Sequence, residues 1–556
     1  MRKKLPPSHL RVVAQRPAPA PVPLPTRLLI NDKKPVETMK GLRKLMKDTR
    51  RFFEHGGRPV HLVFPANGEP PTAEALTPDV LVYQADTFCN PVDARGREID
   101  LPAKVAKLYL KGATGEWGLP PLTSITTAPI LGDDGSMRAA EGYHEATGLW
   151  CFRIPELSVP ENPNEDDARR ALEALRAALR TFPFADAERA REGGVDVVRQ
   201  DTDPGLDESA ALVGLMTAVC RPSLWLAPGF LAEAAQVTGS GSGKGLLARL
   251  MILVAFGTAA KATGARRDNA ELEKTLVAAL RQAAPFVLVD NITDTTVRSN
   301  VLASVLTERP CELRTMRTSN TFIANSGAFI VVTGNGITIT EDLARRFINS
   351  RLDPRCENAE SRPFAMGVGA FLRDIASRRP ELLTAALTIW RWGRRNTIAP
   401  GKTLGSYEVW SRWCRDPLLE LGCQDPVERI GAVKRYDPDR IEIDDLFRLW
   451  DERHGRTHLT AQELHADVKA ALDPISRGRP TSQGRTSARV TGQLGKLVAT
   501  QVGGFRLVSD KHLKPHDTAH YWLEEVEGYT GARGARGSRG ERVEATDLVF
   551  KPRRAK

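Results

Sequence analysis

The strongest chemical signal in the sequence is a glycine-rich loop, residues 237–245, which reads VTGSGSGKG. An apolar segment at 230–237 precedes it, and an expected helix at 246–260 follows it. A strand, a glycine-rich turn and a helix in this order are typical of a phosphate-binding loop, whose backbone N–H groups face phosphate oxygens. The helix N-terminus adds partial positive charge and Lys244 adds a full charge. The expected nucleotide contacts are Gly239, Ser240, Gly241, Ser242, Gly243, Lys244 and Gly245.

Two positions of this loop depart from the full pattern. Thr238 stands where the pattern has its first glycine, and Gly245 stands where a Ser or Thr hydroxyl normally binds Mg²⁺. A glycine–serine string is also typical of a flexible linker. The interpretation as a nucleotide site therefore depends on the segments that follow.

Two later apolar segments each end in a polar side chain. Residues 285–291 read PFVLVDN and residues 328–335 read AFIVVTGN. Ligands of open α/β sheets bind at the carboxyl ends of the strands. Asp290 is thus expected to hold Mg²⁺, directly or through water, and Asn335 to orient the attacking water and sense the γ-phosphate. Taken singly, each segment also fits a core strand with a polar cap.

An arginine pair follows Asn335 by ten residues. Arg345 and Arg346 end the segment EDLARR, and an arginine at a helix end can stabilise transition-state charge, often from a neighbouring subunit. A solvated helix face is the alternative interpretation. The expected catalytic set is Lys244, Asp290, Asn335, Arg345 and Arg346.

This ordered series resembles the replication ATPases of phages and plasmids, of the superfamily III helicase and AAA+ type. The resemblance is closest to the primase–helicase-like ATPases of prophages and integrative elements. It rests on Gly241–Lys244, Phe286–Asn291, Val332–Asn335, Asp342–Arg346 and Leu404–Trp410, and covers roughly residues 28–430.

The resemblance implies an ATP-driven hexameric ring that acts on DNA. It makes Lys244 the Walker A lysine, Asp290 the Walker B acid and Asn335 the sensor, with Arg345 or Arg346 as the arginine finger. Asn291 stands where many such enzymes carry a second acid, so the general base stays unassigned. Residues 28–200 contain no paired acids on a clear strand, and no primase site is expected.

Basic residues suggest two contacts with DNA. Residues 311–322 predict a hairpin before the second core strand, on which Arg314 and Arg317 would track single-stranded phosphates in a ring channel. Farther on, a helix expected at 485–500 carries Arg485, Arg489, Gln493 and Lys496 opposite an apolar stripe. Such a helix suits the major groove of a duplex. An ordinary surface hairpin and a solvated basic helix remain the alternatives.

The sequence as a whole predicts a multidomain α/β protein. We expect a disordered basic, proline-rich arm at 1–27, a mixed N-terminal domain at 28–200, and a P-loop ATPase with a helical extension at 201–435. A winged-helix-like domain at 436–527 and a disordered Arg-Gly tail at 528–556 follow. Short apolar runs at 60–64 and 80–83 predict strands in the N-terminal domain, and residues 166–181 predict a helix.

Composition narrows the function classes. The net charge of +11 over 556 residues favours an acidic partner such as DNA. No charge-free apolar stretch approaches the ~20 residues of a membrane span. The seven cysteines form no CxxC pair, and we expect a cytoplasmic protein with reduced thiols.

Three functions are compatible with these features. The first is a DNA helicase-like motor ATPase, using ATP and Mg²⁺, in replication of a phage or other mobile element. The second is a DNA-binding nucleotide switch, an initiator or regulator with weak or no hydrolysis, which Gly245 and Asn291 favour. The third is an RNA-binding ATPase, favoured only by the Arg-Gly tail.

Overall fold

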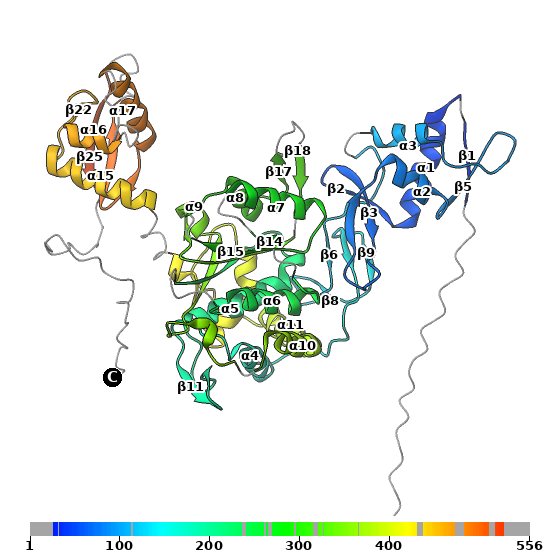
Figure 1. The fold of residues 1–556 in the computed structure, drawn as a ribbon, viewed down its shortest axis with the longest axis horizontal. Coiled ribbons are helices and arrows are strands. Elements are labelled where there is room, and N and C mark those ends of the chain that lie inside the picture. Colours follow the sequence, from blue (N-terminus) through cyan, green and yellow to red (C-terminus); the bar gives the residue numbers. More distant parts are fainter. Residues whose placement is uncertain are drawn as a thin grey trace, which may run out of the picture. The chain divides into compact units, whose positions relative to one another are not determined.

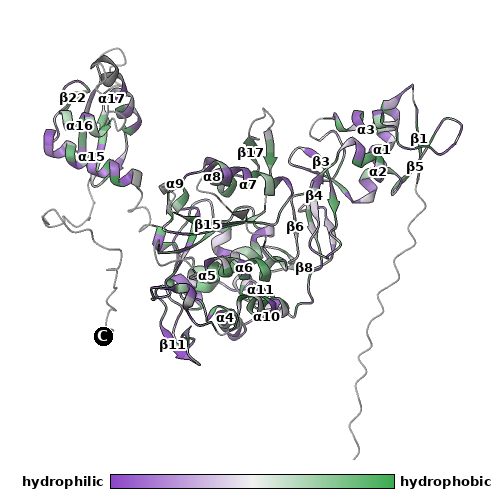
Figure 2. Cartoon of the chain, viewed as in Figure 1, coloured by the Kyte–Doolittle hydropathy of each residue, from purple (hydrophilic) through white to green (hydrophobic). Residues whose placement is uncertain are grey.

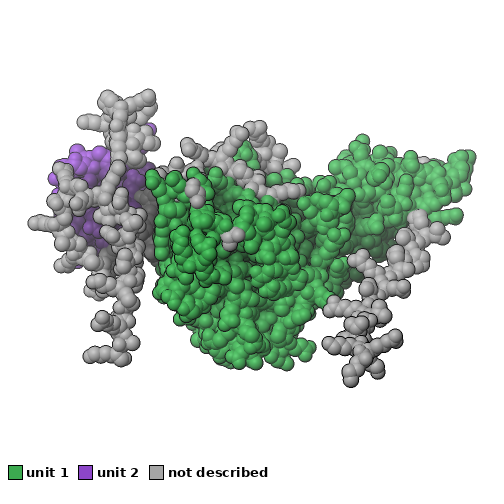
Figure 3. Space-filling view, turned by 60° about the horizontal axis from the view of Figure 1, so that its bottom comes forward, with its two compact units in different colours: residues 1–433 green, residues 434–556 purple. Residues whose placement is uncertain are grey.

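The computed structural model describes residues 26–526 except 32, 113–114, 236–240, 261–262, 265–268, 294–295, 315–320, 326, 365, 431–437, 473–482 and 511–517. The chain divides into two compact units, residues 1–433 and residues 434–556 (Figures 1 and 3). Both expected terminal tails lie outside the described residues, apart from positions 26 and 27. None of the helices in the described ranges combines the length and apolarity that crossing a bilayer requires.

The centre of the first unit is a five-stranded sheet in which every pair of neighbours is parallel (Figure 1). Its order is β14-β15-β19-β13-β21, so the first strand in the sequence lies between two of the last. The strands are β13 (Gly229–Ala234), β14 (Thr263–Gly264), β15 (Phe286–Thr293), β19 (Phe329–Asn335) and β21 (Phe347–Leu352). The sequence predicts an α/β protein, and this parallel sheet with its helices confirms that class.

Helices cover both faces of this sheet. Successive residues of β19 pack into different cores, Phe329 and Val331 into one and Ile330 and Val332 into the other. This alternation follows from the two-residue period of a strand and explains why the strand is apolar throughout. The helices of the larger core are α4 (Glu165–Leu179), α5 (Leu206–Cys220), α6 (Lys244–Phe256), α10 (Val368–Ser377) and α11 (Arg379–Arg395). The smaller core contains α7 (Asn269–Arg281) and α8 (Asn300–Thr307).

Helix α5 lies deepest in the larger core. Its residues are buried all round except the first, and Figure 2 shows α5 and α6 as predominantly hydrophobic. The Trp410 indole N–H donates to Thr217 Oγ1 at 2.8 Å, so a helical turn far downstream closes over α5. Three short helical segments form that region: α12 (Glu408–Trp410), the π-helical η3 (Ser411–Arg415) and α13 (Asp416–Glu420).

The shorter elements of the central region lie around the sheet. A hairpin of β17 (Cys311–Arg314) and β18 (Thr321–Ala324) is antiparallel, as the sequence predicts, although its turn lies outside the described residues. The others are β11 (Arg189–Glu192), β12 (Val195–Val198), η1 (Arg221–Ser223), β16 (Thr296–Val297), β20 (Thr338–Ile339), α9 (Glu341–Ala344) and η2 (Ala359–Ser361).

The N-terminal region has a mixed α+β structure with its own small cores. Its helices are α1 (Pro35–Thr49), α2 (Pro78–Ala85) and α3 (Ala103–Leu110). Its strands are β1 (Thr26–Leu29), β2 (Phe52–His55), β3 (Arg58–Val63), β4 (Thr72–Ala75), β5 (Cys89–Val92), β6 (Ser124–Thr126), β7 (Ile130–Leu131), β8 (Met137–Arg138), β9 (Gly142–His144) and β10 (Leu149–Cys151).

One sequence prediction in this region is wrong. The apolar run at 80–83 is not a strand but the middle of α2. Thr77 caps that helix, its hydroxyl accepting from the Val80 N–H at 3.3 Å, and Pro78 occupies the first helical position. A cap followed by proline is a helix start signal, and it outweighs the strand preference of four apolar residues.

The second unit combines three helices with a four-stranded sheet of order β22-β25-β24-β23. Its elements are α15 (Pro438–His454), β22 (Leu459–Thr460), α16 (Ala466–Leu472), α17 (Gln483–Leu497), β23 (Gln501–Val502), β24 (Phe505–Ser509) and β25 (His520–Glu525). Helix α16 follows β22 and a turn. Strands β24 and β25 pair antiparallel.

Candidate functional site

Lys244 begins helix α6 directly after the described end of the glycine-rich loop. Its side chain is buried, and its Nζ donates to the Ser242 hydroxyl at 3.0 Å. Burial lowers the pKa of Lys244 to about 8, although the nearby Asp290 carboxylate opposes that shift. The loop and the helix N-terminus thus hold a cation against the positive end of a helix dipole, where an anion is the natural partner.

Two glycines of this loop are required by the geometry. Gly243 has a φ of 99° immediately before α6, and Gly241 has a φ of 76°. A Cβ on Gly241 would also lie 2.8 Å from the backbone nitrogen of Glu360 in η2. Larger residues fit neither the left-handed backbone nor this close approach. Gly239 and Ser240, the other expected contacts, lie outside the described residues.

Asp290 lies near the carboxyl end of β15, on an irregularity of the strand. The register between β15 and β19 shifts between Val289 and Ile292, so two residues of β15 oppose one of β19. A bulge of this kind re-aims a side chain at a strand end. Here Asp290 Oδ1 accepts from the Thr333 hydroxyl at 2.6 Å. The Thr333 oxygen in turn accepts from the Asn291 N–H at 3.0 Å, and Asn291 has a φ of 64°.

The other oxygen of Asp290 is engaged by an arginine. Arg249 Nη2 donates to Asp290 Oδ2 at 2.9 Å, and the pair is only partly exposed. Arg249 lies one helical turn after Gly245 and therefore on the same side of α6. A Cβ on Gly245 would lie 2.8 Å from Arg249 Nη1 and 3.1 Å from Asp290 Oδ1. The absence of a side chain at position 245 thus leaves the space into which Arg249 extends.

Asn335 is the last residue of β19, the strand between β15 and β13. It pairs in register with Ala234 of β13 on one side and Thr293 of β15 on the other. Its side chain is buried, and its Oδ1 has no hydrogen-bond partner within the described residues. A buried, unpaired amide oxygen at this edge is suited to orienting a water or ligand donor.

Arg345 and Arg346 lie at the amino ends of the strands of the same sheet, opposite the carboxyl ends that carry Lys244 and Asp290. They directly precede β21, and the Arg346 carbonyl accepts from the Gly229 N–H at 2.8 Å where β13 begins. Both guanidinium groups pair with Asp342, at 3.4 Å and 2.8 Å. A six-residue strand spans about 20 Å, so these arginines do not reach the Lys244 edge of their own chain.

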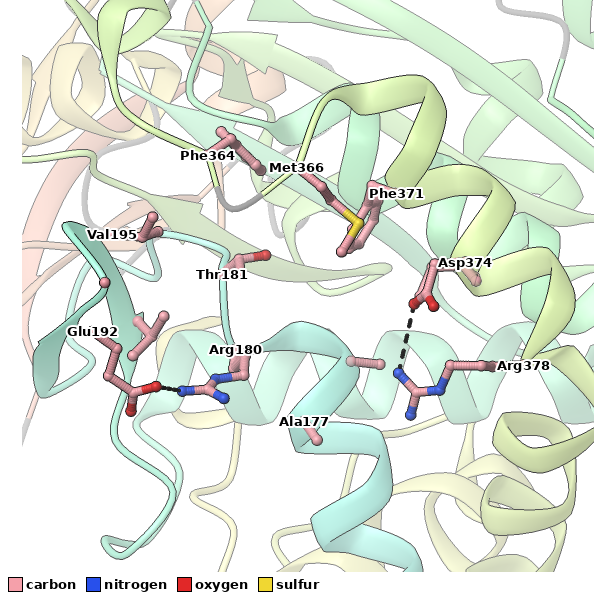
Figure 4. A pocket seen from close by; sticks show the side chains of 14 residues that line it. Ala177, Arg180, Thr181, Glu192, Val195, Phe364, Met366, Phe371, Asp374 and Arg378 are labelled. Atoms are coloured by element: carbon pink, nitrogen blue, oxygen red, sulfur yellow. Dashed lines mark hydrogen bonds and ion pairs between the residues drawn. The ribbon is translucent and has the colours of Figure 1, made fainter.

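A cavity of about 420 Å³ is lined by residues of α4, of the β11–β12 hairpin and of α10 (Figure 4). Its apolar lining includes Phe364, Met366 and Phe371, and ion pairs join Arg180 to Glu192 and Arg378 to Asp374. The connection to the loop runs through Phe182. Its ring lies 5.9 Å from that of Phe371, and a Cβ on Gly243 would lie 3.6 Å from it.

The expected DNA contacts are described only in part. Arg314 ends β17 and Arg485 lies in α17, but the structure does not describe either side chain, and Arg317 lies outside the described residues. In α17, Val490 and Leu494 are buried in the core of the second unit. On the remaining surface of this helix Arg489 and Lys496 are exposed and Gln493 is half-buried.

The sequence reasoning missed Thr333 and Arg249. Thr333 lies two residues before Asn335 and so on the same face of β19, which is a signal that strand periodicity provides. Arg249 follows Gly245 by four residues, which is the spacing of one helical face. Neither signal indicates that both side chains meet at Asp290, because that depends on the order of the strands.

The comparisons with known proteins give weak structural likenesses. No known family model and no curated protein matches the sequence. One similar solved structure is titled "SCCmec type IV Cch - active helicase", with 11% identity, a TM-score of 0.29, and coverage of 85% of this chain and 94% of that chain. Another is "The A form apo structure of NrS-1 C terminal region-CTR(305-718)", with 10% identity, a TM-score of 0.27, and coverage of 82% and 86%. At these TM-scores neither likeness supports a conclusion about activity.

Proposed function

We propose that the chain is a P-loop ATPase that works as a DNA helicase-like motor in replication of a phage or other mobile element. One observation carries the ATPase assignment. Lys244, Asp290 and Asn335 come from segments about 45 residues apart, and they meet at the carboxyl edge of one parallel sheet, beside a helix N-terminus. This is the edge at which open α/β sheets bind nucleotides.

Each group has a chemical role in this proposal. The loop N–H groups and Lys244 bind the β- and γ-phosphates of ATP. Asn335 orients the attacking water with its unpaired amide oxygen. The apolar walls of the cavity beyond Phe182 take the base and ribose, since nucleotide sites combine an apolar pocket with a few polar groups.

The chain offers Mg²⁺ a reduced set of direct ligands at this site. Gly245 supplies no hydroxyl, and both oxygens of Asp290 already accept hydrogen bonds, from Thr333 and from Arg249. A hard cation such as Mg²⁺ requires oxygen ligands in near-octahedral geometry. Direct coordination of Mg²⁺ by Asp290 therefore competes with the ion pair to Arg249, whereas the predicted contact through water does not.

The arginines at the amino edge suggest an oligomer. Neither arginine reaches the nucleotide site of its own chain. Arg345 is exposed and can serve the site of a neighbouring subunit, whereas Arg346 is buried beside Asp342. A homo-oligomeric ring, such as a hexamer, places one subunit's arginines against the next subunit's nucleotide. Motion of the β17–β18 hairpin in the ring channel would then pull single-stranded DNA.

The second unit is proposed to bind duplex DNA as a winged helix. Three helices followed by an antiparallel strand pair are compatible with that fold, and α17 places its apolar face in the core and Arg489 and Lys496 on the surface. An exposed basic helix face of this kind suits the major groove.

The decisive experiment is ATP hydrolysis by the full chain with and without single-stranded DNA. We expect stimulation by DNA that is lost in Lys244→Ala and kept in Lys274→Ala, an exposed lysine of α7 paired with Glu271. Unwinding of a forked duplex should follow the same pattern. Hydrolysis that survives Lys244→Ala would remove the proposal.

A DNA-binding nucleotide switch is the second candidate. The Arg249–Asp290 ion pair favours it, because it occupies the carboxylate that a hydrolysing site would use. Tight ATP binding without multiple turnover, at any DNA concentration, would select this function over the motor.

A further inference from the structure

Gly245 does more than remove a hydroxyl from the loop, because it also makes room for the Arg249 side chain beside Asp290. Gly245 has no side chain to offer a ligand, but it also has no side chain to exclude Arg249. Any residue larger than glycine would place its Cβ 2.8 Å from Arg249 Nη1, so the arginine would have to move. Gly245 and the position of Arg249 are therefore a matched pair.

The guanidinium group is directed at the place where the loop's own hydroxyl would stand. Nη2 binds Asp290 at 2.9 Å, while Nη1 lies against Gly245 in the first turn of α6. The planar guanidinium carries five N–H donors in a fixed fork, and such a fork matches a phosphate as well as a carboxylate. One face of the group can thus stay on Asp290 while other donors reach a phosphate oxygen.

The charge balance of the site agrees with such a role. Burial lowers the pKa of Lys244, and the Asp290 carboxylate lies close enough to oppose part of that lowering. A carboxylate this close to nucleotide phosphates repels them unless a cation lies between the two. Arg249 is a cation already present at that place, held by a direct ion pair.

We propose that Arg249 takes the place of the loop-bound magnesium ion, so that this site binds the phosphates of a nucleotide without a metal held by the protein. This inference rests on the proposed nucleotide site and names its counter-cation. Arg249 is then a phosphate-binding residue, and Asp290 positions it. Asp290 is held in turn by Thr333, and the arrangement continues into the sheet.

The test is the affinity for ATP, measured by titration calorimetry on the full chain in excess Mg²⁺ and in EDTA. For the wild type we expect the two dissociation constants to agree within about threefold, because the fixed cation is a side chain. For Arg249→Gln we expect a loss of about tenfold or more in EDTA, of which Mg²⁺ restores a part, since one charge-assisted phosphate contact is removed.

Two further variants complete the design. Gly245→Ser forces Arg249 aside without removing it and should weaken binding in EDTA to a similar extent. The double variant Gly245→Ser/Arg249→Gln supplies the hydroxyl and frees Asp290, so its binding should become strongly dependent on Mg²⁺. Arg373→Gln, an exposed arginine of α10, is the matched control and should leave both constants unchanged.

The outcomes separate the two proposals. A wild type whose affinity falls more than about tenfold in EDTA, with Arg249→Gln behaving in the same way, overturns the inference and leaves the nucleotide site standing. A wild type that binds no ATP in either buffer overturns the proposed function itself. If Arg249→Gln does not fold, as judged by its thermal unfolding, Gly245→Ser alone decides the question.

Discussion

The two edges of the central parallel sheet carry charge in different ways. At the carboxyl edge, Lys244 and Asp290 are largely buried. Lys244 donates a hydrogen bond to Ser242, and Asp290 accepts hydrogen bonds from Thr333 and Arg249. At the amino edge, the Arg345 side chain is 56% exposed but the Arg346 side chain only 11%, and both arginines pair with Asp342. Groups at the first edge are fixed by their surroundings and can act within one chain. At the second edge only Arg345 is left on the surface, and in the proposed oligomer it acts on a neighbour.

The largest expected effect tests this division of labour. Arg345→Ala/Arg346→Ala should lower kcat for ATP hydrolysis by about 10³-fold, the range of an arginine finger, while ATP affinity changes little. Mixing this variant with Lys244→Ala should recover part of the activity, because mixed assemblies contain some intact composite sites. Steady-state hydrolysis of the single and mixed preparations measures both effects.

A failure of that mixing experiment breaks the comparison. If the double arginine variant is fully active, or if the mixture stays as inactive as its components, the amino edge serves no neighbouring site. Arg373→Ala, an exposed arginine elsewhere, controls for the loss of surface charge.

A second effect sharpens the role of the carboxyl edge. Lys244→Ala should weaken ATP binding by about 10²-fold, because it removes the buried cation beside the helix N-terminus. Calorimetric titration with ATP measures this loss. The effect should be the same at any protein concentration, because the lysine acts within its own chain, and a concentration-dependent effect would argue against that.

The lowered pKa of Lys244 predicts a dependence on pH. The free chain carries the proton on Lys244 below pH 8 and loses it above that value, whereas bound phosphate holds the proton on. Affinity for ATP should therefore fall as the pH rises from 7.5 to 9, by up to about tenfold per unit. Titration at several pH values tests this, with Lys244→Gln as a variant that should show no such slope.

The smallest expected effect concerns Thr333. Thr333→Val keeps the shape of the side chain but removes the hydrogen bonds to Asp290 and to the Asn291 N–H. We expect a loss of about 1–2 kcal/mol in the free energy of unfolding, because the partly buried Asn291 N–H loses its acceptor and Asp290 loses a donor. Urea denaturation measures the loss. Ser substitution at the same position, which keeps the hydroxyl, should be milder.

The sequence predicts the position of residues that lie in short motifs. Lys244, Asp290 and Asn335 each end or follow an apolar strand, and the strand period and the glycine-rich loop are visible in the chain itself. The parallel sheet follows from strands that alternate with helices along the chain. The hairpin at 311–322 and the helix after the loop were located to within a few residues.

The sequence does not predict the order of the strands in the sheet or their register. The placement of Arg345 and Arg346 at the far edge depends on β21 lying parallel beside β13, and that neighbour relation leaves no local pattern. The meeting of Arg249 and Thr333 at Asp290 depends on a register shift in β15. The error at 80–83 has a different origin, since four apolar residues fit either structure and the Thr77 cap decided between them.

The burial of helix α5 has a consequence for how this chain is made. Its surface is apolar nearly all round, and residues far downstream cover it: Trp410 bonds to Thr217, and the Gln424 N–H donates to Ser209 at 3.0 Å. At a synthesis rate of about 5–20 residues per second, the roughly 200 residues between α5 and that cover take on the order of 10–40 s to emerge. During that time the apolar surface of α5 is not yet covered by the downstream residues. Its production in cells should therefore depend on a chaperone that binds nascent chains.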